Sequence, residues 1–386
     1  MRIALFSNSY LPYLSGITVS VKMLKDELCA LGHEVFIVGP KYPGYKEADP
    51  QILRLPSMPA TYPGYRLVWP YSYKIFKQLR QEKIDLIHAH QPFGVGLAAL
   101  ILARRMKVPI VYSFHTLFSR YVHHAPFIPQ RLAKIAIARY LAWFCNRVDT
   151  VIVPSEMVRR LLLLRKVKTP IKVIPTGLKL DLIKQKAELG TQSLELRKKH
   201  RLTEKAKILL CSGRLAPEKN IPFLLHAFEA VKAEVPEAYL IMVGGGPREK
   251  EYRKLAGNQV IFTGQIPHAE VIDHCLAADL FVYASTTETQ GLVLTEAKAC
   301  GLPVVALFGG GLADVVENGL DGYLVRRDQK KFIEHVVRLL KQDGLRRTMA
   351  QKAREDAHER FSSVSVAKRI ETVYNSLIQS FDKLRI

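Results

Sequence analysis

The sequence has few of the features that mark secreted or membrane-spanning proteins. Its 386 residues include five cysteines, which are scattered and form no C-x-x-C pair. Such a set does not make a disulfide framework and favours a reducing compartment, with the thiols buried as structural residues. The longest apolar stretch, PFGVGLAALILA at residues 92–103, is shorter than the roughly 18 residues that a spanning helix needs. We therefore expect no segment that crosses a bilayer.

Two further absences concern export and metal binding. The chain opens with MRIALFSNSY, which leads directly into an apolar strand and lacks the charged, apolar and small-residue regions of a signal peptide. This start favours a cytoplasmic location. No D-x-D motif occurs in the sequence, so the pattern indicates no metal-bridged diphosphate.

Acidic residues are scarce, and the resulting charge is unevenly distributed. Lys and Arg number 57 and Asp and Glu 35, for a net charge of +22. Residues 1–178 hold 25 basic and 9 acidic residues, whereas residues 179–386 hold 32 and 26. This excess is typical of proteins that meet a polyanion, either a nucleic acid or an anionic membrane surface. A nucleic acid is disfavoured, because no helix-turn-helix, RNP, KH or zinc-finger pattern is found.

What the chain does contain is a rhythm of short β-branched runs and helical patterns, which predicts parallel sheets with crossover helices. We expect an α/β protein with two doubly wound parallel-sheet domains, at 1–178 and 207–365, that face each other across a cleft with the active site. A linker is expected at 179–206, and a C-terminal helix at 366–386 that packs back on the N-terminal domain. The expected strands are RIALFSN, EVFIVGP, DLIHAHQP, PIVYSFHT, TVIVPS and KVIPTG in the first domain, and KILLCSG, AYLIMVGGG, QVIFTGQ, DLFVYAS, LPVVALFGGG and GYLVRR in the second.

The stretch STTETQGLVLTEAKACGLPVV, residues 285–305, places two carboxylates eight positions apart. Glu288 lies in the loop after a predicted strand, and Glu296 lies about one turn into a helix that starts near Gly291. The unpaired backbone N–H groups at the start of that helix can hold an anion. The carboxylates can accept hydrogen bonds from the vicinal hydroxyls of a sugar and a ribose. Considered alone, a capping Glu288 and a solvated Glu296 are an equally good interpretation.

A second motif, CSGRLAPEKN at residues 211–220, follows the first predicted strand of the second domain. Arg214 offers a bidentate fork and Lys219 a point charge, a common pair for a diphosphate that is bound without metal. Considered alone, two basic residues in a loop are more often solvated.

Taken in this order, G-R-x-x-x-x-K-N and E-x7-E resemble the motifs of the retaining GT-B glycosyltransferases of family four. The stretches HAHQPFGVG, YSFHTLFSRYVHH, VPSEMV, VIPTGL and DVVENGLDGYLV resemble the diacylglycerol glycosyltransferase branch, the bacterial 1,2-diacylglycerol 3-alpha-glucosyltransferases. The resemblance covers essentially the whole chain. It implies two Rossmann-like domains and the retaining transfer of a hexose to diacylglycerol in glycolipid synthesis. In that branch the hexose is glucose and the donor is UDP-glucose.

The resemblance leaves other substrates and classes open. The same enzyme class could use a phosphatidylinositol-type or a soluble acceptor, and a GT-B-like epimerase would share the donor motifs. The motifs do not fix the sugar among glucose, galactose and mannose, nor UDP against GDP. The family implies no cofactor beyond the nucleotide-sugar substrate and no strict requirement for a metal ion.

The resemblance also implies roles for individual residues. Those implied in catalysis are His115, which touches the donor sugar at the acceptor entrance, Glu288, which binds the sugar hydroxyls, and Arg214 and Lys219, which stabilise the departing diphosphate. The other implied donor-binding residues are Gly16 at the diphosphate, Ile266 at the base, the amides of Gln290, Gly291 and Leu292, and Glu296 at the ribose. Ser15 and Ile17 depart from the family's commoner residues around Gly16. His88 and His90 match the family pattern as supporting residues.

Residues 57–83, SMPATYPGYRLVWPYSYKIFKQLRQEK, combine aromatic rings with basic side chains. We predict that this segment binds anionic lipid through Trp69, Lys74, Lys77, Arg80 and Lys83, with Tyr62, Tyr65, Tyr71 and Tyr73 beside them. The helical patterns at 131–147 and 158–168 also carry basic rims, although burial as ordinary crossover helices is the alternative there. The expected partners are a diacylglycerol-type lipid and the anionic inner face of the cell membrane, where the protein would be peripheral.

Overall fold

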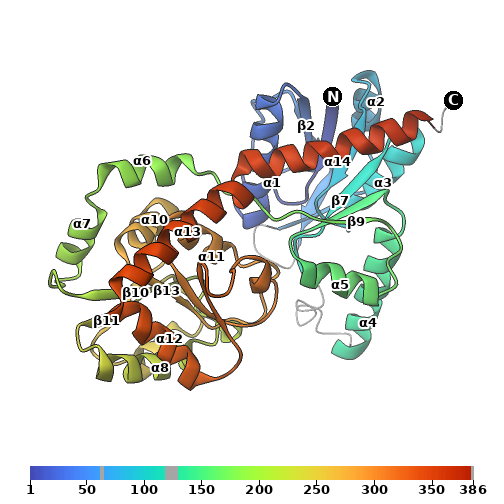
Figure 1. Cartoon of the computed structure of the whole chain (residues 1–386). Helices are drawn as coiled ribbons and strands as arrows, with labels where there is room; N and C mark the ends of the chain where they lie inside the picture. The colour runs from blue at the N-terminus through green and yellow to red at the C-terminus, as the bar shows by residue number, and fades with distance from the viewer. Residues whose placement is uncertain (61–64, 118–128, 384–386) are drawn as a thin grey trace. The chain divides into compact units, whose positions relative to one another are not determined.

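The computed structural model describes residues 1–60, 65–117 and 129–383. Tyr62 and the end of the motif at 112–124 therefore lie outside the described residues. The chain divides into two compact units. Unit 1 comprises Met1–Gly177 and Ser363–Ile386, and unit 2 comprises Leu178–Ser362 (Figure 1).

Unit 1 contains a seven-stranded parallel sheet in the order β3-β2-β1-β6-β7-β8-β9, together with a small antiparallel pair, β4 and β5. Its strands are β1 (Arg2–Phe6), β2 (Glu34–Pro40), β3 (Ile52–Leu55), β4 (Ser57–Pro59), β5 (Arg66–Val68), β6 (Leu86–Ala89), β7 (Ile110–Ser113), β8 (Thr150–Val153) and β9 (Ile171–Val173). Its helices are α1 (Gly16–Ala30), α2 (Tyr73–Gln81), α3 (Val95–Met106), α4 (Gln130–Cys145), α5 (Glu156–Leu164) and α14 (Ser363–Lys383).

The central strand β1 shows why this sequence forms a buried sheet. Ile3 and Leu5 lie in the hydrophobic core on one face, and Ala4 and Phe6 lie in the core on the other. Side chains alternate between the two faces of a strand, so a strand covered on both sides must be apolar at every position. The continuous apolar runs in the sequence report this double burial.

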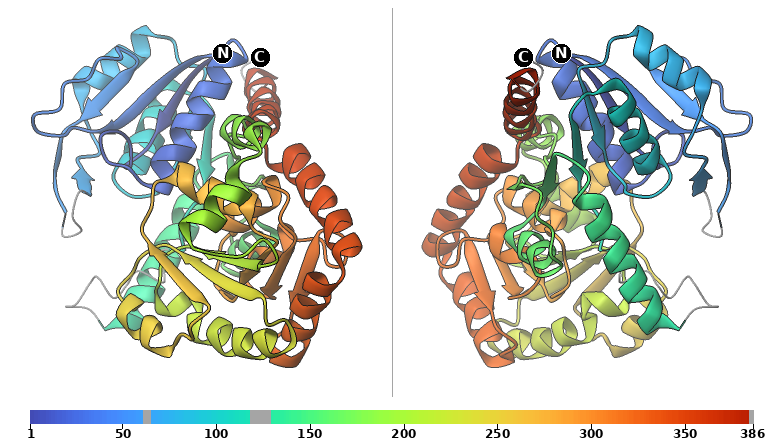
Figure 2. Two further views of the ribbon diagram at one scale, coloured as in Figure 1. Left: turned by 90° about the vertical axis from the view of Figure 1, so that its left-hand side faces the viewer. Right: turned by 90° about the vertical axis from the view of Figure 1, so that its right-hand side faces the viewer.

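Unit 2 contains a six-stranded parallel sheet in the order β12-β11-β10-β13-β14-β15, with helices on both of its faces (Figure 2). Its strands are β10 (Lys207–Ser212), β11 (Ala238–Val243), β12 (Val260–Gly264), β13 (Leu280–Tyr283), β14 (Val304–Leu307) and β15 (Gly322–Val325). Its helices are α6 (Asp181–Leu189), α7 (Gln192–Lys199), α8 (Ile221–Glu234), α9 (Glu249–Leu255), α10 (His268–Ala277), α11 (Leu292–Ala299), α12 (Gln329–Lys341) and α13 (Asp343–Phe361), with short 3-10 turns η3 (Pro217–Lys219) and η4 (Leu312–Asp314).

The prediction of two doubly wound parallel sheets is confirmed, and all twelve expected strands are present. The short strands β3, β4 and β5 were not predicted. The expected linker at 179–206 is wrong as a free connection, because this segment forms α6 and α7 within unit 2. Leu180, Ile183 and Leu196 hold it there, since all three are buried in the core of that unit.

The C-terminal helix α14 belongs to unit 1 and runs alongside α1 (Figure 1). It begins at Ser363, slightly before the predicted start. Ser363 Oγ donates a hydrogen bond of 2.6 Å to Glu27 of α1. Val366, Ile370 and Tyr374 are buried in the same core cluster as strand β1. Helix α14, near the end of the chain, therefore completes a hydrophobic core of unit 1 that also contains residues of β1.

Strand order reverses at one place in each sheet, and ligand sites are expected at these reversals. In unit 1 the neighbours at the reversal are β1 and β6, and in unit 2 they are β10 and β13. Open α/β sheets bind ligands outside the carboxyl ends of their strands at such a switch point. The loops after β6 and β7 and those after β10 and β13 are therefore where functional side chains are expected.

Candidate active site

Lys219 and Glu288 meet at the switch point of unit 2. Lys219 ends the turn that follows β10, and Glu288 lies in the loop that follows β13. Because β10 and β13 pair as neighbours, the two loops leave the sheet side by side. The Nζ atom of Lys219 lies 2.6 Å from Oε1 of Glu288, and their side chains are only 17% and 21% exposed. This pair is a half-buried ion pair at the ligand-binding edge of the sheet.

Two hydroxyl groups complete the contacts of this ion pair. Tyr283 and Ser285 each donate a hydrogen bond of 2.9 Å to Oε1 of Glu288, and Lys219 donates one of 2.8 Å to the Tyr283 hydroxyl. Burial disfavours the ionised carboxylate, but the charge of Lys219 and these hydrogen bonds outweigh it and hold the pKa of Glu288 below its usual value. Glu288 is therefore a fixed carboxylate at neutral pH.

Glu296 has a different partner. It lies on α11, and its Oε1 is 2.9 Å from Nε2 of His268, the first residue of α10. The hydrogen bond that the Glu296 carboxylate accepts from His268 raises the pKa of His268, although burial opposes this. The contact places the loop after β12, which includes Ile266, next to the helix that carries Glu296. The predicted base-binding and ribose-binding residues therefore lie on neighbouring elements.

Helix α11 starts four residues after Glu288, and the glycine-rich loop at 309–311 contacts the backbone of Glu288. Gly291 precedes the helix with φ of +91°, and the amide of Gly311 donates a hydrogen bond of 2.8 Å to the backbone oxygen of Glu288. A Cβ atom on Gly310 would stand 2.4 Å from that same oxygen. Gln290 is buried and Leu292 is 36% exposed. The close approach requires glycine at position 310 and fixes the path of the Glu288 loop.

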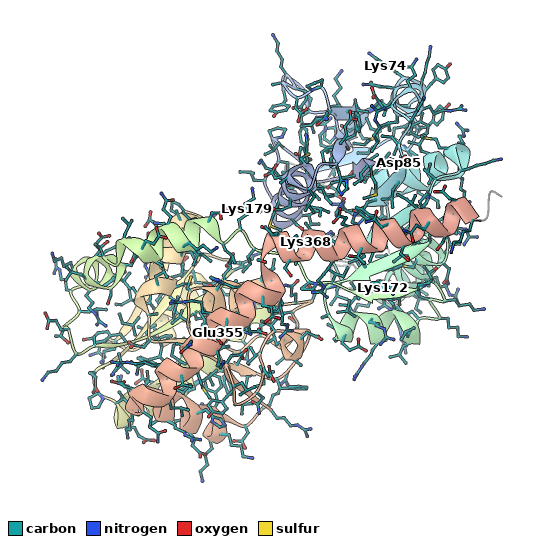
Figure 3. All side chains as sticks on the ribbon, turned by 45° about the horizontal axis from the view of Figure 1, so that its top comes forward. Lys74, Asp85, Lys172, Lys179, Glu355 and Lys368 are labelled. Carbon is teal, nitrogen blue, oxygen red and sulfur yellow. The ribbon has the colours of Figure 1, made fainter. Side chains whose placement is uncertain are left out.

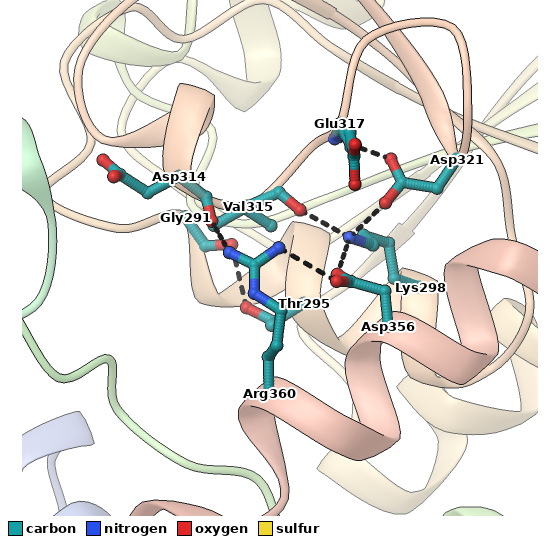
Figure 4. A network of polar contacts seen from close by, with 9 residues as sticks. All are labelled: Gly291, Thr295, Lys298, Asp314, Val315, Glu317, Asp321, Asp356 and Arg360. Atoms are coloured by element: carbon teal, nitrogen blue, oxygen red, sulfur yellow. Dashed lines mark hydrogen bonds and ion pairs between the residues drawn. The ribbon is translucent and has the colours of Figure 1, made fainter.

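A buried lysine fixes the other end of α11 (Figure 4). The side chain of Lys298 is fully buried, and its Nζ contacts the carboxylates of Asp321 and Asp356 and the backbone oxygen of Val315. Arg360 of α13 binds Asp356 at 2.9 Å and donates to the backbone oxygen of Asp314. These contacts tie α11, α13 and the loop at 312–321 to one another, and no local sequence pattern predicts them.

Arg214 is exposed and follows β10 by two residues. It lines a small hollow at the end of that strand together with Gly213, Lys219 and Tyr283. The two cations of the G-R-x-x-x-x-K-N motif therefore lie around one hollow, but only Lys219 is bound to Glu288.

The other two predicted residues, Gly16 and His115, belong to unit 1. Gly16 is the first residue of α1, and a Cβ atom there would meet nothing within 4 Å. Ser15 caps this helix, because its Oγ accepts from the amide of Thr18 at 3.2 Å. His115 follows β7, and its Nε2 lies 3.0 Å from Nδ1 of His90. The residues therefore lie after β1, β6 and β7, at the switch point of unit 1.

Comparison with known proteins agrees with this geometry. The descriptions Glycosyltransferase Family 4 and Glycosyl transferases group 1 match residues 14–182 and 192–356. The chain is 36% identical over 333 residues to an alpha-monoglucosyldiacylglycerol synthase of Streptococcus pneumoniae, covering 84% of this chain and 75% of that protein. The chain belongs to glycosyltransferase family 4. The family and the branch predicted from the motifs are confirmed.

Two further comparisons, one with a relative and one with a solved structure, cover nearly the whole of this family 4 glycosyltransferase. An alpha-monoglucosyldiacylglycerol synthase of Acholeplasma laidlawii is 30% identical over 397 residues, with 99% of each chain covered. Among solved structures, HepE of Anabaena in complex with UDP has a TM-score of 0.75 at 21% identity, covering 98% of this chain and all of the other. The latter match shows the same two-sheet GT-B fold.

The predicted lipid-binding segment of the glycosyltransferase is largely exposed. On α2, Ile75, Phe76 and Leu79 are buried, whereas Lys74, Lys77 and Arg80 recur every third residue on the exposed side. Lys74 marks this helix in Figure 3. Lys83 is exposed just beyond the helix, and Trp69 and Tyr73 are 63% and 69% exposed. Of the other predicted rings, Tyr65 contacts Tyr13 within unit 1, whereas Tyr71 contacts Phe76 but remains 40% exposed.

The two helical patterns whose burial was left open are partly exposed. Helix α4 buries Leu141 and Phe144 but leaves Leu132 and Ile135 59% and 46% exposed. Beside them Arg131, Lys134 and Arg139 are also exposed. On α5, Leu164 is 83% exposed. Neither helix is an entirely buried crossover. None of the helices at 1–60, 65–117 and 129–383 is long and apolar enough to span a membrane.

Three side chains of the site were missed by sequence reasoning. Tyr283 and Ser285 lie in the predicted strand DLFVYAS and its end, where their position at the carboxyl edge was a usable signal. His268 carried no local signal, because its contact with Glu296 depends on how α10 and α11 pack. Within the parts of the chain that the structure describes, no group of three or more His, Cys, Asp or Glu side chains is arranged to hold a metal ion.

Proposed function

We propose that this protein transfers glucose from UDP-glucose to diacylglycerol with retention of the anomeric configuration, in glycolipid synthesis. The observation that best supports this choice of substrates is the match to an alpha-monoglucosyldiacylglycerol synthase over 99% of both chains. The UDP bound by the fold neighbour from Anabaena supports the choice of nucleotide. The site supports the reaction type, because it provides a fixed carboxylate and two cations at the switch point of unit 2.

In this proposal the donor lies along the carboxyl edge of the sheet of unit 2. Glu288 accepts hydrogen bonds from the sugar hydroxyls, Glu296 binds the ribose, and the backbone of Ile266 meets the base. The diphosphate lies at the start of α11, near the amides of Gln290, Gly291 and Leu292, because helix N-termini favour anions. The family resemblance also assigns Gly16 to the binding of the diphosphate.

The central electrostatic demand of the reaction is the charge that develops on the departing diphosphate. Arg214 and Lys219 meet it with built-in cations, which are preorganised before the bond breaks. The diphosphate oxygen that leaves the anomeric carbon then takes the proton of the acceptor hydroxyl as that hydroxyl attacks the same face of the sugar. The family resemblance assigns His115 to the donor sugar at the acceptor entrance. This arrangement accounts for retention without a covalent intermediate.

The proposal is tested by incubating the protein with UDP- and GDP-sugars and with diacylglycerol in mixed micelles, and by identifying the product and its anomeric configuration by NMR. We expect an α-glucosyl product from UDP-glucose, and undiminished activity in excess EDTA. Transfer only to phosphatidylinositol or to a soluble acceptor would overturn the choice of acceptor. Activity that is lost in EDTA and restored by a divalent ion would overturn the metal-free account.

Replacing Glu296 by glutamine is expected to raise KM for the nucleotide-sugar about tenfold with little change in kcat, because a charged hydrogen bond to the ribose is lost in the ground state and the transition state alike. Initial rates at varied donor concentration measure both constants. Glu355→Gln, on the exposed side of α13, is the matched control and should resemble the wild type. A fall in kcat at unchanged KM would contradict the assignment to ribose.

We further propose that the exposed side of α2 docks on the anionic inner face of the cell membrane. Four cations, Lys74, Lys77, Arg80 and Lys83, would each contribute about 1 kcal/mol at a charged lipid surface. Trp69 and Tyr73 would insert at the level of the headgroups and make part of the binding resistant to salt. Such binding is reversible and brings the enzyme to its lipid acceptor.

Changing Lys74, Lys77, Arg80 and Lys83 together to glutamine is expected to abolish most sedimentation with phosphatidylglycerol vesicles and to slow transfer to vesicle-borne diacylglycerol at least about tenfold, since roughly 4 kcal/mol of attraction is removed. The control changes four exposed cations of unit 2 to glutamine, Lys250, Arg326, Arg327 and Lys330, and has the same net charge. Equal losses in both variants would show that charge alone, and not this surface, governs binding.

A further inference from the structure

A chain of buried ring contacts leads inward from His115 in unit 1. Nε2 of His115 lies 3.0 Å from Nδ1 of His90, and the two rings are stacked. The His90 ring also lies against that of His88, with centroids 4.2 Å apart. His88 is held at both nitrogens, because Nδ1 lies 2.5 Å from the hydroxyl of Tyr374 and Nε2 lies 2.8 Å from Oγ of Ser113.

This chain leaves His115 one nitrogen for a ligand. Since Nε2 is engaged by His90, only Nδ1 of the partly exposed ring can meet a substrate. His90 itself is 2% exposed and His88 is fully buried, so neither can contact a substrate directly. The orientation of the His115 ring is therefore set by His90. His90 packs in turn against His88 of β6, which is bound to Ser113 of β7 and to Tyr374 of α14.

The imidazoles are neutral near physiological pH. Burial lowers the pKa of His115 to about 4. Burial, with a smaller contribution from His115, lowers the pKa of His88 to about 3, and burial followed by both neighbouring histidines lowers the pKa of His90 well below its usual value. A neutral imidazole has one N–H donor and one acceptor nitrogen, so the hydrogen bond between His90 and His115 has two possible directions.

The surroundings of His90 favour one direction. Its Nε2 is buried, and among the described residues it has no hydrogen-bond partner. His90 lines a cavity of ≈ 40 Å³ whose other walls include apolar side chains such as Met23, Phe114 and Ile152 together with Ser20, Ser113 and Ser363. None of the described residues accepts a hydrogen bond from Nε2. If His115 donated to His90, the proton of His90 would stand on Nε2 as a buried N–H that none of these residues pairs, an arrangement that proteins rarely tolerate. If His90 instead donates from Nδ1, its Nε2 carries no proton, and only a lone pair is left unpaired at that buried nitrogen.

We propose that His90 is a positioning residue that donates its Nδ1–H to His115 and thereby fixes His115 as the tautomer that carries its proton on Nδ1. His115 then presents a neutral N–H donor to the substrates. Such a group can bind an oxygen of the sugar or of the acceptor, but it cannot remove the acceptor proton. The significance of this donor rests on the proposed function, in which the departing diphosphate takes that proton.

The tautomer can be read directly in the full-length protein. With ¹⁵N-labelled histidine, long-range ¹H–¹⁵N correlation spectra distinguish a protonated Nδ1 from a protonated Nε2, and the spectrum of His115→Asn identifies the His115 signals. We expect the Nδ1–H form of His115, unchanged between pH 6 and pH 8. An Nε2–H form, or a charged ring at pH 7, would overturn the proposal. This result needs no substrate, so it stands or falls independently of the proposed function.

Two substitutions at His90 add a kinetic test. In His90→Asn the side-chain amide replaces the Nδ1–H donor, so His115 should keep its tautomer and kcat should stay within about threefold of the wild type. In His90→Asp a carboxylate accepts from Nε2 of His115, so the tautomer should switch, the pKa of His115 should rise, and kcat should fall about tenfold or more. Equal kcat in the two variants with matching thermal stability would contradict the proposal.

Discussion

Replacing Lys219 by alanine is expected to lower kcat for glucosyl transfer by about 10²–10³-fold, the usual cost of removing one preorganised group that stabilises developing charge. Lys219 acts twice in the proposed site. It neutralises the departing diphosphate, and it holds Glu288 in place through the 2.6 Å ion pair. Steady-state rates with UDP-glucose and diacylglycerol measure the loss. Lys232→Ala removes a lysine that also forms an ion pair on α8 and should leave kcat unchanged.

The same variant should change the pH dependence of the residual activity. Burial disfavours the Glu288 carboxylate, and the charge of Lys219 is the main factor that holds its pKa down. Without Lys219 the pKa of Glu288 should therefore rise, so the ionised form is lost at a higher pH as the solution is acidified. The acid limb of the rate profile is expected to move to higher pH. A profile and a kcat like those of the wild type would remove Lys219 from the mechanism.

Replacing Lys298 by alanine is expected to destabilise unit 2 by about 3–5 kcal/mol, because it leaves buried carboxylates without their cation. Lys298 is fully buried, and Asp321 beside it is 2% exposed. Burial already raises the pKa of Asp321 despite the adjacent ammonium. The melting temperature of the transition that includes unit 2 should fall by on the order of 10 °C.

The matched control for Lys298 is Lys352→Ala on α13. Lys352 pairs with Glu355 at the surface, where both side chains are about half exposed, and such pairs contribute little to stability. A melting temperature that falls equally in both variants, or in neither, would contradict the account of Lys298 as a buried tie between α11 and α13.

The strands were predictable because double burial is recorded locally, as an unbroken apolar run such as residues 3–6. The pairs that make up the site were not predictable from local pattern. Lys219 and Glu288 lie far apart in sequence, and they meet only because β10 pairs with β13 instead of continuing in chain order. Strand order is decided by packing across the whole sheet, so the two motifs could be interpreted together only through the family resemblance.

The buried polar contacts were unpredictable for a related reason. Lys298 lies two positions after Glu296, and nothing in EAKACG distinguishes a solvated lysine from a buried one. The difference arises from Asp321 and Asp356, which come from a loop and from α13. The pairing of His88 with Tyr374 likewise joins residues that lie 286 positions apart. The strands β4 and β5 were missed because only Val68 among their residues is buried, so they carry no apolar run.

The return of α14 to unit 1 sets an order of events during synthesis. Unit 2 is one continuous segment, whereas the first 177 residues of unit 1 must wait for Tyr374 and its neighbours on the final helix. At about 5–20 residues per second, the ribosome needs on the order of 10–40 s to add the rest of the chain. During that interval the nascent sheet exposes the apolar surface that α14 later covers, and it is a natural client for chaperones. A chain that is released before Ser363 never closes this surface, so loss of the last helix would send the product to proteolysis.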